Sequence, residues 1–319
     1  MATTVPTTST EQDRVLREAC GLVDRSALGK LALTGTEAKP FLTGQVTNDI
    51  EALEPGHGQY AALLTPKGKM LADLRVLDTG EELLLICERA GLQAVFDTIR
   101  RFSLGHDVEL HKRTVQQGLL SLVGPGSCAV AGVDETAAGE EHMNARASIG
   151  GADVLLVRTD LGVDVVCAAE STEPVRAALV AAGAVEVSED AAEILRVESG
   201  RPRHGVELDE TVIPQEAGLN DRAVSFTKGC YVGQETVARL HWRGKPNRHL
   251  RGLALSAPVP VGTELVRGEK VVGRIASAVE SPVHGHIALA FVRREASPGD
   301  ELALKETEAT ATVIELPFS

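Results

Sequence analysis

The sequence lacks a long apolar run and a recognisable targeting segment. No stretch of 18 consecutive apolar residues occurs in its 319 residues, so it predicts no membrane-spanning helix. Residues 1–12 contain no lysine or arginine and no apolar segment, and the first arginine is Arg14. This composition is not typical of a signal or transit peptide. We therefore expect residues 1–12 to form a disordered tail.

Cysteine is sparse and scattered. The five cysteines are Cys20, Cys87, Cys128, Cys167 and Cys230. No two of them form a Cys-x-x-Cys pair, which excludes the local signature of a zinc or iron–sulfur site. An odd number of dispersed cysteines suits a reducing compartment, so we expect a cytoplasmic protein. Four of them lie in apolar or helical surroundings typical of packing residues, and Cys230 is the exception.

Positive charge is also in deficit. The chain has 45 acidic and 32 basic side chains and a net charge of −13. Proteins that bind a phosphate backbone usually present a basic face, so direct nucleic-acid binding is not expected. One local run is basic: Arg239, His241, Arg243, Lys245, Arg248, His249 and Arg251. This run is compatible with a solvated helix and loop, or with a funnel for a polyanionic ligand or an acidic partner.

The most informative segment is Lys228-Gly-Cys-Tyr-Val-Gly-Gln-Glu235. A nearby ammonium and a helix N-terminus both favour the thiolate form of cysteine. Residues 234–243 predict a helix, so Cys230 would lie in the loop that enters it. Gly229 and Gly233 predict backbone angles or close contacts that a side chain would forbid. Two interpretations remain open here: a functional thiol, or a small buried cysteine in a tight turn.

Apolar periodicity predicts an α+β fold built by duplication. The first half predicts a helix over 11–21, a strand over 28–33, a helix capped by Thr36 and ending at Leu42, strands over 59–64, 70–77 and 83–87, a helix over 91–102, and strands over 108–111 and 119–123. The second half predicts strands over 153–158 and 163–167, a helix over 172–182, and another helix capped by Ser188. Residues 132–151 between the halves predict a loose connection.

A different pattern begins near residue 250. Short strands are predicted over 250–256, 263–266, 270–276, 286–292 and 311–316. Proline and glycine turns separate them, and this even spacing is typical of a small β-barrel or sandwich. We therefore place a domain boundary near residues 247–250.

Several ordered motifs together resemble one known family. They are Gly29–Gly35, Gln45–Asp49, Thr65–Arg75, Leu195–Arg203, Pro214–Gly218 and Lys228–Glu235. In these motifs the chain resembles the YgfZ-type folate-binding proteins, which are relatives of the glycine-cleavage T-protein (aminomethyltransferase). The resemblance implies a cloverleaf: two ferredoxin-like units that form a folate-binding body over 13–248, followed by a barrel over 249–319.

The resemblance also implies site residues. The glutamate of the Leu-Arg-x-Glu-x-Gly motif, here Glu198, would hold the pterin by accepting a fork of two hydrogen bonds. Tyr60 and Asp73 reproduce the spacing between a pocket tyrosine and the catalytic aspartate of T-proteins. The alternatives are a surface helix residue for Glu198 and a polar residue on an exposed strand face for Asp73. Ala72 and Gln234 depart from the T-protein pattern, which argues against full aminomethyltransferase activity.

The function implied is a tetrahydrofolate-binding accessory protein that supports the assembly or repair of iron–sulfur enzymes, including radical enzymes that modify tRNA. Its chemically active residues would be Cys230 and Asp73, with Lys228 tuning the thiol. The functional motif would comprise Lys228, Gly229, Cys230, Tyr231, Gly233, Gln234 and Glu235. One alternative is a folate-dependent transferase acting on an aminomethyl or methyl donor. Another is a protein-binding scaffold without folate affinity.

Overall fold

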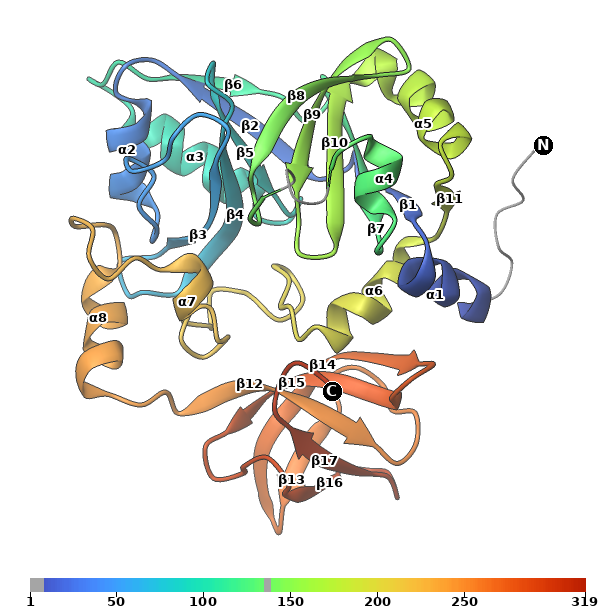
Figure 1. Ribbon diagram of the computed structural model, residues 1–319. Coiled ribbons are helices and arrows are strands. Elements are labelled where there is room, and N and C mark those ends of the chain that lie inside the picture. The colour runs from blue at the N-terminus through green and yellow to red at the C-terminus, as the bar shows by residue number, and fades with distance from the viewer. Residues whose placement is uncertain (1–8, 135–138) are drawn as a thin grey trace. The chain divides into compact units, whose positions relative to one another are not determined.

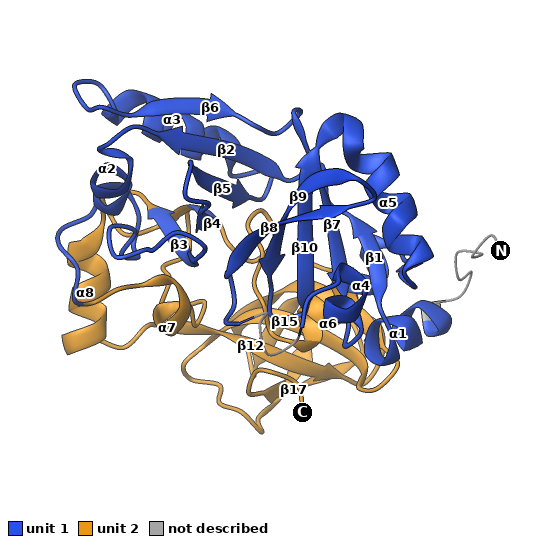
Figure 2. Ribbon diagram, turned by 45° about the horizontal axis from the view of Figure 1, so that its top comes forward, with its two compact units in different colours: residues 1–63, 72–192, 227–231 blue, residues 64–71, 193–226, 232–319 orange. Residues whose placement is uncertain are grey.

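A computed structural model describes residues 9–134 and 139–319. The chain divides into two compact units (Figure 2). Unit 1 comprises residues 1–63, 72–192 and 227–231, and unit 2 comprises 64–71, 193–226 and 232–319. Unit 1 holds two β-sheets and their helices, and unit 2 holds a closed β-barrel. The predicted α+β class with a C-terminal barrel is therefore confirmed. No helix in the described ranges combines the length and apolar character needed to cross a bilayer.

Unit 1 consists of two halves with the same order of elements (Figure 1). The first half contains β2 (Gly29–Thr34), α2 (Ala38–Gln45), β3 (Gly58–Leu64), β4 (Met70–Asp78), β5 (Leu83–Cys87), α3 (Leu92–Phe102) and β6 (Glu109–Lys112). The second half contains β7 (Gln117–Val123), α4 (Ser127–Ala131), β8 (Asn144–Ile149), β9 (Ala152–Arg158), β10 (Gly162–Ala168), the 3-10 turn η1 (Ala169–Ser171), α5 (Thr172–Ala181) and β11 (Val185–Glu186).

The strand order shows the duplication directly. The five-stranded sheet has the order β3-β4-β5-β2-β6, and the six-stranded sheet has the order β8-β9-β10-β7-β1-β11. Corresponding strands occupy corresponding places, except that β1 (Gly21–Asp24) is inserted between β7 and β11. It pairs antiparallel with β7 and parallel with β11. The insertion places residues 21–24 inside the sheet of the second half.

The two sheets of unit 1 share one apolar core. Successive side chains of a strand point to opposite faces of its sheet. On β9, Leu155 and Val157 face a cluster with residues of β4 and β5, whereas Val154 and Leu156 face a cluster that includes α4 and α5. The shared cluster contains Leu77, Leu84, Ile86, Leu119, Leu155, Val157 and Val166. Burying each such side chain contributes about 1.5–3 kcal/mol, so these clusters hold the halves together.

Unit 2 contains a closed six-stranded barrel. Its strands are β12 (Arg248–Leu255), β13 (Glu264–Arg267), β14 (Lys270–Ser281), β15 (Gly285–Arg293), β16 (Glu301–Leu304) and β17 (Thr310–Ile314), in the closed order β12-β15-β14-β13-β16-β17. Closure leaves no unpaired sheet edge. Unit 2 also holds α7 (Asn220–Ala223), α8 (Gln234–Arg243) and most of α6 (Glu189–Glu198). The boundary expected near 247–250 stays a prediction, and β12 begins at Arg248.

The N-terminal predictions need correction. Helix α1 spans Ser9–Glu18, so residues 9–12 of the expected tail are helical, and the remaining tail residues, 1–8, lie outside the described residues. Residues 21–24 form β1 because the edges of β7 and β11 pair with them. The expected cap at Thr36 is wrong, because α2 begins at Ala38 and the Thr36 hydroxyl donates to Asp107 at 2.6 Å.

The predicted helix cap at Ser188 is present, whereas part of the predicted loose connection and one barrel strand differ from expectation. The cap at Ser188 is confirmed, because its hydroxyl accepts from the amide of Ala191 at 3.3 Å. The loose connection over 132–151 is wrong at 144–149, where β8 pairs with β9 through a turn at residues 150–151. Residues 135–138 lie outside the described residues. Strand β16 was not predicted, because four residues flanked by charged loops carry little periodic signal.

Candidate functional site

Tyr60 and Asp73 meet across the β3–β4 hairpin of unit 1. The Tyr60 hydroxyl donates a hydrogen bond of 2.6 Å to Oδ2 of Asp73. Met70, Ala72 and Leu74 lie on the buried face of β4, so the alternation of the strand turns Asp73 to the opposite, half-buried face. A hydroxyl bonded to a carboxylate stabilises the charged form and fixes its orientation. The structure thus brings together the two residues paired by their thirteen-residue spacing.

The segment after α2 runs beside β3 and accounts for the Gln45–Asp49 motif. The backbone amide of Thr47 donates to Ala62 O at 3.0 Å, and the Ala62 amide donates to Thr47 Oγ1 at 2.8 Å. The Asn48 side-chain amide donates to Tyr60 O at 3.0 Å. These side chains satisfy backbone groups at the edge of β3. The motif therefore holds the strand that carries Tyr60.

Lys228 caps the C-terminus of α2. Its Nζ donates to Val46 O at 2.7 Å and also to Thr43 O. The last carbonyls of a helix lack intrahelical partners and carry partial negative charge, so an ammonium is favourable there. The same Nζ lies 4.7 Å from the ring centroid of Tyr231. Burial lowers the pKa of Lys228 to about 8, with the charge of Asp49 acting in the opposite direction. Tuning of Cys230 by Lys228 stays a prediction.

Cys230 differs from the other four cysteines, all five lying in described segments. Cys20, Cys87, Cys128 and Cys167 are buried, and Cys230 is exposed in the loop before α8. Burial raises the pKa of Cys20 and Cys87 to about 12, which keeps those thiols protonated. The predicted packing roles are confirmed, and the alternative of a buried Cys230 is wrong. Among the five cysteines, only Cys230 therefore has an accessible thiol.

The two glycines of the motif have different roles. Gly233 adopts φ 85° before α8, and an added Cβ would lie 2.6 Å from Thr65 O and 3.1 Å from the Gly68 Cα. Gly68 also has a positive φ, of 76°, and its added Cβ would lie 2.9 Å from Thr236 Cβ. The expectation is therefore confirmed for Gly233. It is wrong for Gly229, where an added Cβ would meet no atom of the described chain within 4 Å.

The remaining motif residues surround the start of α8. Gln234 and Glu235 form its first turn, where the negative charge of Glu235 is favourable. Tyr231 is buried, and this burial raises its pKa to about 12. Tyr231 is therefore a packing residue beneath Lys228.

In unit 2, Glu198 ends α6 and is buried, with 7% of its surface exposed. Ser281 Oγ, at the end of β14, donates to Glu198 Oε1 at 2.5 Å. The same Oγ accepts from the amides of Val283 and His284 at 3.1 and 2.9 Å, so its one hydrogen is directed at Glu198. The alternative of a surface helix residue is wrong. Glu198 is an oriented carboxyl group.

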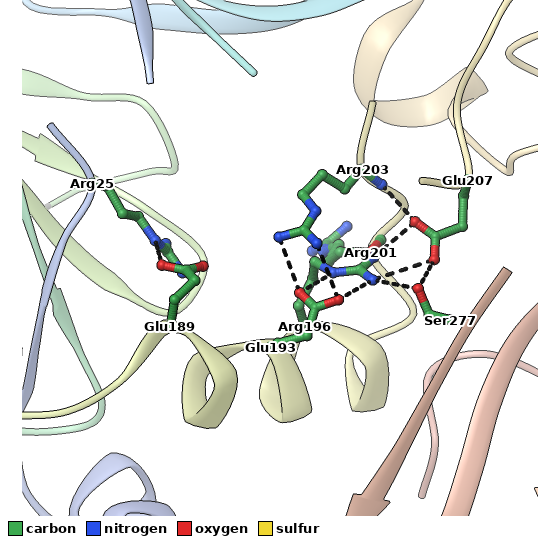
Figure 3. Close-up of polar contacts among 8 residues, drawn as sticks. All are labelled: Arg25, Glu189, Glu193, Arg196, Arg201, Arg203, Glu207 and Ser277. Carbon is green, nitrogen blue, oxygen red and sulfur yellow. Dashed lines mark hydrogen bonds and ion pairs between the residues drawn. The ribbon is translucent and has the colours of Figure 1, made fainter. Parts of the chain in front are cut away.

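A second serine of β14 donates a hydrogen bond to a second buried carboxylate (Figure 3). Ser277 Oγ donates to Glu207, which also accepts from Arg196 Nη1 at 3.1 Å and from the backbone amide of Arg203 at 3.0 Å. Arg196 Nη2 donates to Glu193 at 2.7 Å. Although burial opposes it, bonding to Glu193 and the charge of Glu207 raise the pKa of Arg196. This network accounts for Arg196 and Arg203, two of the three arginines of the Leu195–Arg203 motif.

Sequence reasoning missed the groups that position these residues. Ser281 lies 83 positions from Glu198 in the sequence, and no local pattern links them. Arg75, which shares a strand face with Asp73, pairs with buried Asp164 at 2.6 Å, and Ser121 donates to that carboxylate at 2.6 Å. The two-residue alternation of β4 was the signal that could have placed Arg75 on the same face as Asp73.

Comparisons with known proteins cover nearly the whole chain. The GCVT N-terminal domain matches residues 3–228, and the glycine cleavage T-protein C-terminal barrel domain matches residues 248–319. The aminomethyltransferase of Rubrobacter xylanophilus is 30% identical over 96% of this chain and 85% of the relative. The aminomethyltransferase of Bacillus subtilis is 26% identical over 97% of this chain and 90% of the relative. The crystal structure of aminomethyltransferase T from Bartonella henselae matches with a TM-score of 0.88 and 22% identity, over 100% of this chain and 91% of that one.

Proposed function

The chain belongs to the glycine cleavage T-protein family, and from this premise we propose that it is a cytoplasmic, YgfZ-type accessory protein that uses tetrahydrofolate to support iron–sulfur enzymes. Membership in the family supports a folate cofactor. The observation that carries the accessory role is the exposed thiol of Cys230, while the other four cysteines are buried. Its clients would include radical enzymes that modify tRNA.

The polar groups of both units suit a folate. A pterin presents N–H and amino donors, which need acceptors. In unit 2, Glu198 is a buried acceptor held in one orientation by Ser281. In unit 1, Asp73 is oriented by Tyr60, and the side-chain oxygens of Gln45 and Gln59 are buried without a hydrogen-bond donor in the described ranges. Buried acceptors normally find a donor, so Gln45 and Gln59 of unit 1 suit a donor-rich ligand.

Each residue then has a specific role. Glu198 would accept hydrogen bonds from the pterin. Asp73, fixed by Tyr60, would place negative charge near the reduced ring and stabilise positive charge that develops there. When bound, the folate supplies a carrier for one-carbon groups. Cys230, exposed in its loop, would contact the client either by thiol–disulfide exchange with a client disulfide or by direct contact with the client's iron–sulfur cluster.

Calorimetric titration with tetrahydrofolate under anaerobic conditions tests the binding role. Glu198→Ala should abolish measurable binding. Ser281→Ala should weaken it about tenfold, since a hydrogen bond to a charged group contributes about 1.5–3 kcal/mol. Ser277→Ala is the matched control, because it removes the same group from the same strand but frees Glu207 instead. No binding by the wild type, or equal losses in both serine variants, would contradict the assignment.

Complementation of a deletion strain tests the thiol. Cys230→Ala should leave folding intact and abolish the support of iron–sulfur client enzymes. Cys128→Ala serves as the control, because it removes a buried thiol instead of the exposed one. Full client activity with alanine at 230 would refute the thiol role and leave only the folate-binding role.

A second candidate is a folate-dependent aminomethyl or methyl transferase. The Tyr60–Asp73 hydrogen bond favours it, as do the aminomethyltransferase relatives. Against it, Ala72 is fully buried on the other face of β4, in place of the first of the paired aspartates usual in T-proteins. An assay of methylene-folate formation with aminomethyl donors distinguishes the two. Asp153→Asn, which changes an exposed carboxylate on β9, is the control. Turnover that falls at least a hundredfold in Asp73→Asn but survives in Asp153→Asn would establish the transferase.

A further inference from the structure

Trp242 lies on the surface of unit 2 and contacts a neighbouring aromatic ring. It is the single tryptophan of the chain and is 71% exposed. Its ring meets the ring of His241 edge-on, with centroids 4.6 Å apart and planes at 87°. His241 in turn stacks on Phe226 at 3.8 Å and 19°. Ring contacts of this kind restrict the side chain before a partner binds, and tryptophan is enriched among residues that dominate interfaces.

Unpaired basic side chains lie close to Trp242 in the sequence. Arg239, Arg243 and Lys245 are exposed, and within residues 9–134 and 139–319 no carboxylate forms an ion pair with any of them. Two other arginines of the same basic run, Arg248 and Arg251, each pair with a glutamate of unit 2. The predicted basic run therefore divides into a paired part on β12 and an unpaired part at the end of α8.

We infer that the α8 patch, defined as Phe226, Arg239, His241, Trp242, Arg243 and Lys245, docks an acidic segment with apolar side chains on a partner protein. Carboxylates would complement the unpaired cations, and an apolar side chain would cover Trp242. Residues 239–245 span about 10 Å of helix and following chain, which suits a short peptide segment.

A nucleic acid fits the patch less well. A phosphate backbone needs basic groups along a longer track, and the net charge of −13 opposes a polyanion. A short acidic segment is affected mainly by charges within about 8 Å at physiological salt, so the local cations dominate. The inference does not rest on folate binding. It places the docking surface in the same stretch of sequence, residues 228–245, that carries the exposed thiol.

The fluorescence of Trp242 provides a direct test, because no other tryptophan contributes. The probe is a twelve-residue peptide of Asp, Glu and Leu, with a neutral twin of Asn, Gln and Leu. We expect a saturable blue shift with the acidic peptide, at least tenfold weaker binding of the twin, and weakening by salt. Arg239→Gln combined with Arg243→Gln should reduce affinity about tenfold, because two exposed charge pairs with the peptide are lost.

A matched control exists at the end of α3. There Arg100 and Arg101 precede Phe102, which is 46% exposed. Arg100→Gln combined with Arg101→Gln removes the same charge and should leave the affinity unchanged. Binding of a labelled peptide to Trp242→Ala, followed by anisotropy, should be about tenfold weaker, with an unchanged circular dichroism spectrum confirming the fold.

Four results would overturn the inference. They are no shift with the acidic peptide, an equal response to the neutral twin, an equal loss in the α3 control, and an equal or stronger response to a twelve-nucleotide oligouridylate. The last result would identify the α8 patch as a nucleic-acid or general anion surface.

Discussion

The two halves of unit 1 share a topology but not a chemistry. In the first half, β4 buries Ala72 and Leu74 on one face and presents Asp73 and Arg75 on the other. In the second half, the corresponding strand β9 is apolar over residues 154–157 and contributes to clusters on both faces. A duplicated sheet can thus keep one copy as packing support while the other carries polar residues. Conversion of a strand face needs only alternate positions to change.

The largest effect should follow from breaking the buried link between the halves. Arg75 pairs with Asp164, which is buried in β10. Arg75→Met leaves that buried carboxylate without its ion-pair partner, so the free energy of unfolding should fall by about 3–5 kcal/mol. The measurement is urea unfolding followed by circular dichroism.

A matched control for this prediction is another ion pair between the halves. Arg146 of β8 pairs with Glu81 on the surface. Arg146→Met should change the free energy of unfolding by no more than about 1 kcal/mol, since solvent screens the pair. Equal losses in the two variants would show that burial of Asp164 does not govern the link.

An intermediate effect should distinguish the two hairpin turns. Gly68, in the β3–β4 turn, and Gly151, in the β8–β9 turn, both have positive φ, 76° and 81°. Alanine at either should cost about 1–2 kcal/mol from the left-handed backbone alone. Gly68→Ala should cost more, because its Cβ would lie 2.9 Å from Thr236 Cβ, whereas at Gly151 no described atom lies within 4 Å. Thermal unfolding of both variants checks the difference.

The smallest effect concerns the helix ends. Helix α4 of the second half is followed by Gly132 as its C-cap, with φ 72°, whereas the end of α2 is capped by Lys228. Lys228→Met should cost about 1 kcal/mol at pH 7. The folded-state pKa of Lys228, about 8, lies below the ordinary 10.5. The unfolded chain therefore binds more protons between these values, and the stability from Lys228 should rise with pH there. A difference between wild type and variant that stays flat from pH 8 to 10 would contradict this.

Much of the fold was predictable because its strands and helices carry strong periodicity. For the strands that carry Tyr60 and Asp73 and for those of the barrel, most predicted ends lie within one to three residues of the observed ends. The wrong assignments lie where strand pairing, and not the local sequence pattern, decides the structure. Residues 144–149 have few large apolar side chains and become a strand because the edge of β9 is available. The pairing of Tyr60 with Asp73 was also predictable, because a hairpin brings near sequence neighbours together.

The family, the class of fold and the identity of the polar residues follow from residue type and local spacing alone. What each polar residue contacts depends on the folded structure. Lys228 lies 182 positions from the carbonyl of Val46 that it caps, and Ser281 lies 83 positions from Glu198. Such partners are chosen by the packing of whole elements, where buried polar groups must find a complement. Their identity is a property of the folded chain.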